Sequence, residues 1–497
     1  MTGVSTSRLR FSSSFRPRFA PIHEMRLNFG STIAREESVL EAAAVDAFAA
    51  DLRGEVIRRG DPTYDEERKL YNGMIDKHPA LIAKVVDAGD VMTAVNFGRG
   101  EGLDIAIRCG GHNGPGLGSV DDGLVIDLSE IRGTRVDPVA RTAQVGGGSL
   151  LGDVDHATHA FGLAAPFGIF STTGVGGLTL GGGVGNLGRT FGLSIDNLLS
   201  ADVVLADGSF VTTDATHEPD LFWALRGGGG NFGVVTSFTF QLHPVSTVIA
   251  GPMFWPIERS AEVLSFYRDF LPSAPDELNG WFAFLTVPPV APFPEELHLQ
   301  KMCAVLWCYV GSQEDADAAL APVRELGGIA MDGVQAMPYP MLQSAFDALF
   351  PPGLQWYWKV QLMEEISDDA VAVEVAFGEQ LPNPLSTTHM YPVDGAAGRI
   401  PSGETAWPHR NAKWVQVIAG IDEDPANAPV IKSWASGFWE ALRPYATGGS
   451  YQNMMMVEGD EGVKAVYGDH FDRLARIKAH YDPTNLFHVN QNIVPKA

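Results

Sequence analysis

Glycine is concentrated in three short stretches of this 497-residue chain, and these stretches constrain the fold more than any other feature. Nine of the nineteen positions between residues 174 and 192 are glycine, and smaller clusters occur at residues 110–118 and 227–233. Glycine permits positive φ angles and a close approach of the backbone to another group. Runs of free backbone N–H groups form concave anion sites. Three such clusters favour a bound dinucleotide over tight turns alone.

The segments around the glycine clusters alternate between helix and strand patterns. The predicted helices span residues 37–51, 87–102 and 149–163. The predicted strands span residues 103–109, 123–129 and 141–148. Two β-rich runs joined by Asp207-Gly208 predict a hairpin over residues 198–213. Residues 220–245 predict a helix, a glycine loop and a strand.

The character of the sequence changes at about Pro244. Nine of the ten tryptophans lie beyond it, and the glycine clusters stop there. We therefore expect a second lobe of antiparallel sheet plus helices over residues 246–450. The tail, residues 469–495, predicts a helix stopped at Asp482-Pro483 and then an extended segment.

Composition excludes several classes of partner. The net charge of −25 disfavours nucleic acid, and no apolar run is long enough to cross a bilayer. Three cysteines argue against a disulfide framework, and Cys303 and Cys308 are expected as buried thiols. The arginine-rich start lacks a secretory core, so we expect a cytoplasmic protein with a disordered segment over residues 1–35, a transit-like segment being the alternative.

Short motifs alone do not identify the dinucleotide. Residues 183–188 and residues 228–233 both fit G-x-G-x-x-G, but the first match does not follow a clean buried strand, so we reject a Rossmann domain. Asp153, His156 and His159 stand at helical spacing. No further ligand cluster accompanies them, so we expect a solvated helix face and no metal.

The order of these segments resembles the vanillyl-alcohol oxidase and p-cresol methylhydroxylase flavoproteins, and within them the berberine bridge enzyme-like oxidases. The motifs that carry the resemblance are RCGGH (108–112), STTGVGGLTLGGGVG (171–185), GLSIDNLLSADVVLADG (192–208), WALRGGGGNFGVVTSF (223–238), YQN (451–453) and YDPTNLFHVNQNI (481–493). Together they cover most of residues 70–497 in the family's order. The resemblance implies an α+β fold with two lobes, a split p-cresol methylhydroxylase-type FAD lobe and a substrate lobe.

The resemblance also implies boundaries and a cofactor attachment. The FAD lobe would span residues 36–245, with its core at about 76–245, and residues 451–497 would return to it. His112 matches the histidine that relatives bond to the 8α-methyl of FAD. Phe170 stands where many relatives have a second linking cysteine, so we expect a single covalent bond. Gly114 replaces a tyrosine that is common in plant relatives.

Three residues are expected at the reaction centre. Tyr451 matches a tyrosine that acts as catalytic base in several relatives, although a structural role is the alternative and its activator is not identified. Gln416 matches a polar position facing the substrate, next to Trp414, which replaces a lysine of some plant members. Thr173 matches the position that controls access of oxygen to the flavin in the family, where oxidases commonly have valine and dehydrogenases leucine, and its valine-like size favours an oxidase.

The remaining residues that the resemblance places at the cofactor come from the matched motifs. They are Arg108, Gly110, Gly111, Asn113, Gly114, Phe170, Thr172, Gly174, Gly177, Gly181, Gly182, Gly183, Gly185, Asn186, Asn197, Gly230, Asn231, Gly233, Val234, Val235, Asn453 and Asn490.

The resemblance thus implies an FAD-dependent oxidase. It would pass hydride from a sugar, an alcohol or an aromatic natural product to flavin N5, with dioxygen reoxidising the flavin to give hydrogen peroxide. A dehydrogenase with another electron acceptor and a non-catalytic flavin-binding or sugar-binding protein are the alternatives. Most tryptophans of the second lobe are expected in its core.

Overall fold

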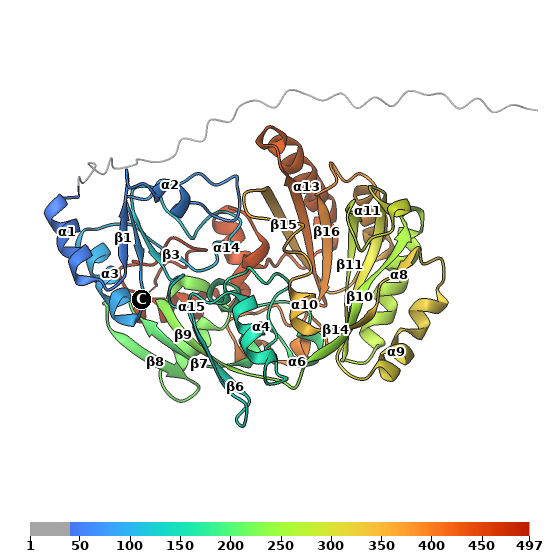
Figure 1. Ribbon diagram of the computed structural model, residues 1–497, viewed down its shortest axis with the longest axis horizontal. Coiled ribbons are helices and arrows are strands. Elements are labelled where there is room, and N and C mark those ends of the chain that lie inside the picture. Colours follow the sequence, from blue (N-terminus) through green and yellow to red (C-terminus); the bar gives the residue numbers. More distant parts are fainter. Residues whose placement is uncertain (1–39, 497) are drawn as a thin grey trace, which may run out of the picture.

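A computed structural model describes residues 40–496 of the chain. The expectations for residues 1–35 lie outside them. Three sheets make up the described part, together with the helices that cover them (Figure 1). Among residues 40–496, no helix combines the length and the apolar character that a membrane crossing requires.

The first sheet has four strands in the order β1-β2-β4-β3. Its strands are β1 Glu55–Arg58, β2 Leu81–Lys84, β4 Leu124–Asp127 and β3 Ile105–Arg108, of which the last three run parallel. Two helices, α1 Ala42–Asp51 and α3 Ala88–Gly100, share an apolar core with it, and the short α2 Tyr64–Glu67 follows β1. The β4 strand is buried along its whole length, as expected of an apolar strand inside a parallel arrangement.

The second sheet is antiparallel, with five strands in the order β5-β6-β9-β7-β8. These strands are β5 Thr134–Asp137, β6 Thr142–Gly146, β9 Val234–Gln241, β7 Leu198–Val204 and β8 Phe210–Asp214. The predicted hairpin is confirmed, because β7 pairs with β8 across Gly208, whose φ of +83° suits glycine. The helices of this region are α4 Leu151–His159, α5 Val175–Leu180, α6 Gly188–Phe191 and α7 Pro219–Leu225.

The rejection of a Rossmann domain is confirmed. The stretch from Gly183 to Gly188 follows helix α5 and ends at the first residue of α6, whereas a dinucleotide fingerprint needs a strand before the glycines.

The third sheet is antiparallel and lies on the other side of the molecule (Figure 1). Its main path is β13-β10-β12-β11-β16-β17-β15, with β14 paired to β10. The strands are β10 Thr247–Pro256, β11 Leu278–Thr286, β12 Lys301–Tyr309, β13 Met331–Asp332, β14 Gln335–Pro338, β15 Gln355–Met363, β16 Thr387–Pro392 and β17 Trp414–Asp422. The associated helices are α8 Ser260–Phe270, α9 Gln313–Glu325, α10 Tyr339–Gln343, α11 Asp368–Gly378, α12 Ala396–Arg399 and α13 Ala428–Leu442.

The two faces of the third sheet have different neighbours. Helices α8, α9, α11 and α13 pack on one face through two apolar clusters. Side chains of the other face, such as Trp356 and Val417, belong to the large core that continues into the second sheet. Cys303 and Cys308 are buried free thiols of β12, as predicted.

The C-terminal segment returns to the first two sheets (Figure 1). It contains α14 Gly459–Tyr467 and α15 Phe471–Tyr481, and the predicted stop at Asp482-Pro483 is confirmed. The Lys478 ammonium donates to the Asn231 carbonyl at 2.9 Å and to the Phe487 carbonyl at 2.8 Å. The Asn231 amide in turn donates to the Gln491 carbonyl and accepts from the Ile493 N–H. These bonds attach the tail to the glycine loop before β9.

A buried ion pair supports this attachment. Lys478 Nζ lies 3.1 Å from Asp482 Oδ2, and both side chains are 0% exposed. Replacing Lys478 with methionine would leave Asp482 without its countercharge, so we expect the free energy of unfolding to fall by about 3–5 kcal/mol. Denaturant titration followed by circular dichroism measures the change.

The matched control is Lys496→Met. Lys496 Nζ also lies 3.1 Å from a carboxylate, that of Asp472, but these side chains are 66% and 65% exposed. An exposed pair contributes less than about 1 kcal/mol. Equal losses in the two variants would contradict the role assigned to the buried pair.

Candidate active site

A cavity lies where the three sheets and the C-terminal segment meet. Its lining includes the end of β3, the glycine-rich loops, the inner faces of β15, β16 and β17, and residues 451–454 and 487–491. Most of this lining is apolar. Arg108 is the only Lys, Arg, Asp or Glu among the described residues that line it, and its guanidinium pairs with Asp127.

Glycines bring two loops of the lining into backbone contact. A Cβ atom on Gly110 would lie 2.4 Å from the Gly174 nitrogen, and one on Gly174 would lie 2.4 Å from Cys109 Sγ. No larger residue fits at either position. At Gly177 and Gly230, which also line the cavity, a Cβ atom would meet no protein atom within 4 Å. The bare backbone of these two glycines therefore faces the cavity.

Unsatisfied polar atoms belong to the same lining. One guanidinium nitrogen of Arg108, Oδ1 of Asn490 and Nε2 of Gln491 are buried and have no hydrogen-bond partner among the described residues. Buried polar groups normally have partners. A glycine-lined cradle with unsatisfied donors and acceptors fits a large polar cofactor such as FAD.

His112 lies in the cavity wall between Tyr71 and two threonines. Its ring stacks on Tyr71 with the centroids 3.9 Å apart. Nε2 lies 3.1 Å from Thr172 Oγ1, and Nδ1 lies 3.5 Å from Thr173 Oγ1. Burial lowers the pKa of His112 to about 4, so the imidazole is neutral at physiological pH. A neutral imidazole keeps one nitrogen lone pair available as a nucleophile.

The two positions that depart from the family pattern have local explanations. Phe170 lines the cavity, and its ring centroid lies 6.0 Å from those of Phe346 and Phe350. At Gly114, a Cβ atom would lie 2.5 Å from Cε3 of Trp358. The Trp358 indole therefore occupies the space into which a side chain at position 114 would project.

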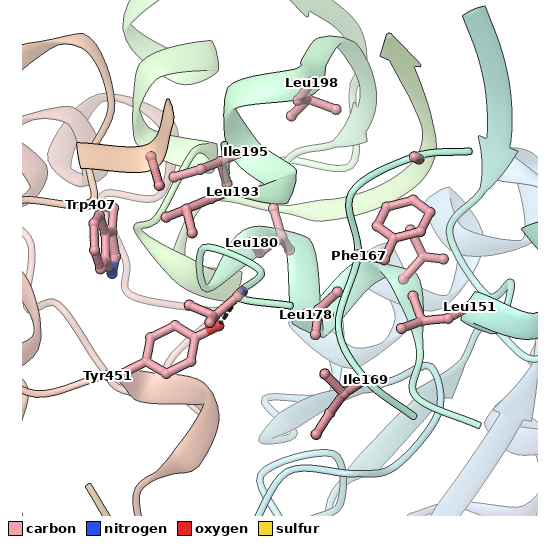
Figure 2. Close-up of a cluster of buried hydrophobic side chains, with 14 of the residues drawn as sticks. Leu151, Phe167, Ile169, Leu178, Leu180, Leu193, Ile195, Leu198, Trp407 and Tyr451 are labelled. Carbon is pink, nitrogen blue, oxygen red and sulfur yellow. Dashed lines mark hydrogen bonds between the residues drawn. The ribbon is translucent and has the colours of Figure 1, made fainter. Parts of the chain in front are cut away.

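The Tyr451 hydroxyl accepts three hydrogen bonds. The donors are the backbone N–H groups of Gly183 and Val184, both at 3.1 Å, and the Asn453 amide at 3.0 Å. Figure 2 shows the Tyr451 ring directed at the chain that follows α5, with a hydrogen bond to its hydroxyl oxygen marked. Burial raises the pKa of Tyr451 above its usual value, whereas the three N–H donors lower it by stabilising the phenolate.

The glycine-rich sequence accounts for this arrangement of donors. Gly182 and Gly183 have φ angles of +128° and +84°, which other residues rarely adopt. This turn directs two consecutive N–H groups toward one oxygen. The hydrogen-bond donors to the Tyr451 hydroxyl, which the sequence did not reveal, are therefore two backbone N–H groups and the Asn453 amide.

Gln416 does not face the cavity, and the prediction that it faces the substrate is wrong. Side chains of a strand alternate between its two faces, and Val415 and Val417 line the cavity. Gln416 points to the opposite face, where its Nε2 donates to buried Glu374 of α11 at 3.0 Å. Trp414 lies on that face too, packed against Tyr267.

Two asparagines predicted at the cofactor have other partners. Asn186 donates to Gln343 and accepts from Trp281, and the Asn197 amide donates to the carbonyls of Phe191 and Leu193. Neither lines the cavity, so the expectation of direct cofactor contact is wrong for both.

The other predicted residues divide into two groups. Those that line the cavity are Arg108, Gly110, Gly111, His112, Asn113, Phe170, Thr173, Gly174, Gly177, Gly230, Gly233, Val235, Tyr451, Asn453 and Asn490. Those that lie behind its lining are Gly114, Thr172, Gly181, Gly182, Gly183, Gly185, Asn231 and Val234.

The candidate metal ligands on α4 are not assembled into a site. Asp153 accepts a hydrogen bond from the Leu150 N–H, as a helix cap does, and His156 is exposed. Within residues 40–496, no group of three or more His, Cys, Asp or Glu side chains could hold a metal ion.

Sequence reasoning missed many residues of the cavity wall, among them one tyrosine before β2 and three polar residues of β16. Tyr71 comes from the segment before β2, and Thr387, His389 and Tyr391 come from β16. The signal for the last three is the alternation in TTHMYP, because polar side chains two residues apart share one face of a strand.

Comparisons with known proteins agree with this architecture. A family model described as FAD binding domain matches residues 79–214, and one described as berberine and berberine like matches residues 450–494. An FAD-linked oxidoreductase of Dictyostelium discoideum is 32% identical over 460 residues, which cover 91% of this chain and 97% of the relative. The (R)-6-hydroxynicotine oxidase of Paenarthrobacter nicotinovorans is 29% identical over 471 residues, covering 90% and 98% of the two chains.

Solved structures share the fold. The 6-hydroxy-D-nicotine oxidase from Arthrobacter nicotinovorans superposes with a TM-score of 0.79 at 27% identity, covering 90% of this chain and 98% of that one. A glucooligosaccharide oxidase from Acremonium strictum, whose flavin is described as 6-S-cysteinyl, 8α-N1-histidyl FAD, has a TM-score of 0.81 at 23% identity, covering 91% and 100%.

The glycine cradle predicts the effect of one side chain on cofactor content. In Gly177→Leu the new side chain would project into the cavity without meeting protein atoms, so we expect stability to be kept and the FAD content of the purified protein to fall. The ratio of flavin absorbance to protein absorbance measures the content. Gly100→Leu is the control, because Gly100 is also in a helix with free space at its Cβ position but is exposed on α3. Full FAD content in Gly177→Leu would contradict the proposed position of the cofactor.

Proposed function

This chain belongs to the berberine bridge enzyme-like FAD-linked oxidoreductases, and we propose that within them it is an oxidase of a hydroxylated small molecule. FAD, when bound, accepts a hydride from the substrate and passes two electrons to dioxygen, which becomes hydrogen peroxide. The substrate is a sugar, an alcohol or an aromatic natural product. The observation that carries the proposal is the Tyr451 hydroxyl, which receives three N–H hydrogen bonds at the cavity wall.

We assign FAD binding and coverage of the substrate side to different regions of the chain. Residues 36–245 and 451–497 bind FAD, and residues 246–450 cover the cavity on the substrate side. The sheet that supplies β15, β16 and β17 to the lining lies within the second region, which supports this division. Three free cysteines suit a cytoplasmic enzyme.

Tyr451 acts as the general base in this proposal. A phenolate at Tyr451 takes the proton of the substrate hydroxyl as hydride leaves the adjacent carbon. Hydrogen bonds to the charged form favour it, and the two backbone donors cannot be lost by side-chain rotation. A buried phenolate without such donors would be strongly disfavoured.

His112 is the attachment point of FAD in this proposal. Its neutral ring, which lines the cavity and is held against Tyr71, supports the assignment. Phe170 has no nucleophilic atom, so His112 forms the single covalent bond. Cys109 also lines the cavity, but burial raises the pKa of its thiol to about 11, so little thiolate is present at neutral pH.

Thr173 supports the choice of dioxygen as electron acceptor. It lines the cavity beside His112 and is near valine in size, which leaves room for a small molecule. A dehydrogenase that reduces another acceptor is the alternative, and peroxide measurement separates the two.

The covalent bond can be tested without a substrate. We expect the yellow colour to stay with the acid-precipitated wild-type protein and to pass into the supernatant in His112→Ala. The control is Cys109→Ser, which should keep the flavin in the pellet because the thiol takes no part. Flavin absorbance of both fractions is the measurement. Wild-type flavin found wholly in the supernatant would refute the bond.

The role of Tyr451 predicts a rate and a pH dependence. Tyr451→Phe should retain its flavin but lose about 10²–10⁴-fold in kcat, since it lacks the base. The base must be deprotonated, so activity should rise with pH through the raised pKa of Tyr451. Asn453→Leu removes one donor to the phenolate, raises this pKa further and moves the rising limb of kcat/KM to higher pH.

Peroxide production in air over a panel of sugars, alcohols and phenols is the measurement for these variants. Dye reduction without peroxide would replace the oxidase by a dehydrogenase. No turnover in either assay would indicate a flavin-binding protein without catalysis. A kcat unchanged in Tyr451→Phe would assign the base to another residue.

A further inference from the structure

Three polar side chains of β16 share the face that lines the cavity. Thr387, His389 and Tyr391 are two residues apart along the strand and all three belong to the lining. Met390, between them, points to the opposite face and packs in the core beneath α8 and α11. The neighbouring strand β17 contributes only Val415, Val417 and Ala419 to the cavity. This polar row therefore stands within an otherwise apolar wall.

The Phe284 carbonyl, at the Thr387 end of the row, fixes the direction of each hydrogen bond along it. Thr387 Oγ1 lies 2.7 Å from the Phe284 carbonyl, which can only accept, so the Thr387 hydroxyl donates there. Its oxygen therefore accepts from His389 Nε2, which lies 3.2 Å away and must carry the hydrogen.

Burial sets the protonation state of the histidine. It lowers the pKa of His389 to about 3, so the imidazole is neutral and carries one hydrogen. With that hydrogen on Nε2, Nδ1 has only a lone pair. The Tyr391 hydroxyl, 2.7 Å from Nδ1, is consequently the donor of that bond.

The cavity thus contains two phenols with opposite hydrogen bonding. Tyr451 accepts three N–H bonds, which favour its phenolate. Tyr391 donates to His389, which favours its neutral form, and both burial and the charge on Tyr451 raise its pKa well above the usual value. Hydrogen bonding therefore favours the neutral phenol at Tyr391 and the phenolate at Tyr451. The lone pairs of the Tyr391 oxygen accept no hydrogen bond from residues 40–496.

We propose that Tyr391 orients the substrate by accepting a hydrogen bond from one of its hydroxyl groups, and that His389 is a positioning residue that fixes the Tyr391 hydroxyl. This inference rests on the proposed function in one respect, namely that the cavity is the substrate site. The molecule that carries this hydroxyl is uncharged. A cation or an anion would lose its hydration in a cavity whose described lining offers it no unpaired charged side chain. The hydroxyl is carried by a ring, because the indoles of Trp356 and Trp358 line the same cavity and offer flat apolar surfaces for packing. The substrate class is an uncharged hydroxylated ring compound.

A matched pair of probes tests the acceptor. Oxidised holoenzyme is titrated with 2-naphthol and with 2-methoxynaphthalene, which has the same ring system but no hydroxyl hydrogen, and binding is followed by the change in flavin absorbance. We expect the wild type to bind the naphthol about threefold to tenfold more tightly, as one neutral hydrogen bond allows. In Tyr391→Phe the two probes should bind equally.

Two further tyrosine variants make the result decisive. Tyr339→Phe is the matched control, because Tyr339 is a buried phenol outside the cavity lining, and the preference should persist. Tyr451→Phe tests whether the other phenol receives the probe. A preference kept in Tyr391→Phe and lost in Tyr451→Phe would overturn the proposal. Equal binding of the two probes by the wild type, or no binding of 2-naphthol, would overturn it as well.

The positioning role of His389 has its own readout. Asparagine can place an acceptor oxygen near the Nδ1 position, so His389→Asn should retain the naphthol preference, whereas His389→Leu should lose it. A merely structural role would make the two variants alike, and that outcome would refute the positioning role. Binding ratios do not depend on turnover or on the flavin bond. A failure of this proposal is therefore distinguishable from a failure of Tyr451 as base or of His112 as attachment point.

Discussion

The three hydrogen bonds that converge on the Tyr451 hydroxyl are the contact on which the rest of the site depends. Two of them join residue 451 to a turn 267 and 268 residues earlier in the chain, so the C-terminal segment must return to the first half of the molecule for these two to form. The turn needs two glycines with positive φ, and the return needs the buried Lys478–Asp482 pair together with Asn231. Substitutions at any of these positions would change the environment of the Tyr451 oxygen.

The cavity separates two kinds of surface. On the side of the glycine-rich loops, bare backbone and unsatisfied polar atoms face it, as suits a large polar cofactor. On the side of the antiparallel sheet, aromatic and aliphatic side chains face it, and the row of Thr387, His389 and Tyr391 supplies its directional polarity. Among the described residues, the cavity lining has no unpaired charged side chain that could set the two phenols apart. The direction of their hydrogen bonds therefore distinguishes them. The Tyr451 oxygen accepts hydrogen bonds, whereas the Tyr391 hydroxyl donates one.

The local pattern of the chain predicted much of the fold. The hairpin at Gly208, the helix that ends at Asp482 and the change near Pro244 are each encoded within a few residues, and the structure has the expected elements there. The order of the glycine motifs indicated the FAD-linked family, and His112, Tyr451 and Asn453 do line one cavity. One prediction failed because the answer depended on which face of a strand a residue occupies. Gln416 shows this, because a shift of one residue from Val415 or Val417 reverses the side-chain direction.

The sequence by itself determined the glycine turns, the elements they join and the absence of a thiol at position 170, because these depend on the chemistry of single residues and their immediate neighbours. Only the tertiary structure decided which groups donate to the Tyr451 hydroxyl, why position 114 is glycine and which polar residues of β16 meet the cavity. Those answers depend on atoms far apart in the chain. Trp358 occupies the space beside Gly114, and the Phe284 carbonyl sets the direction of hydrogen bonding that ends at Tyr391. Such contacts arise from the packing of residues that are distant in sequence, so no short stretch of residues specifies them.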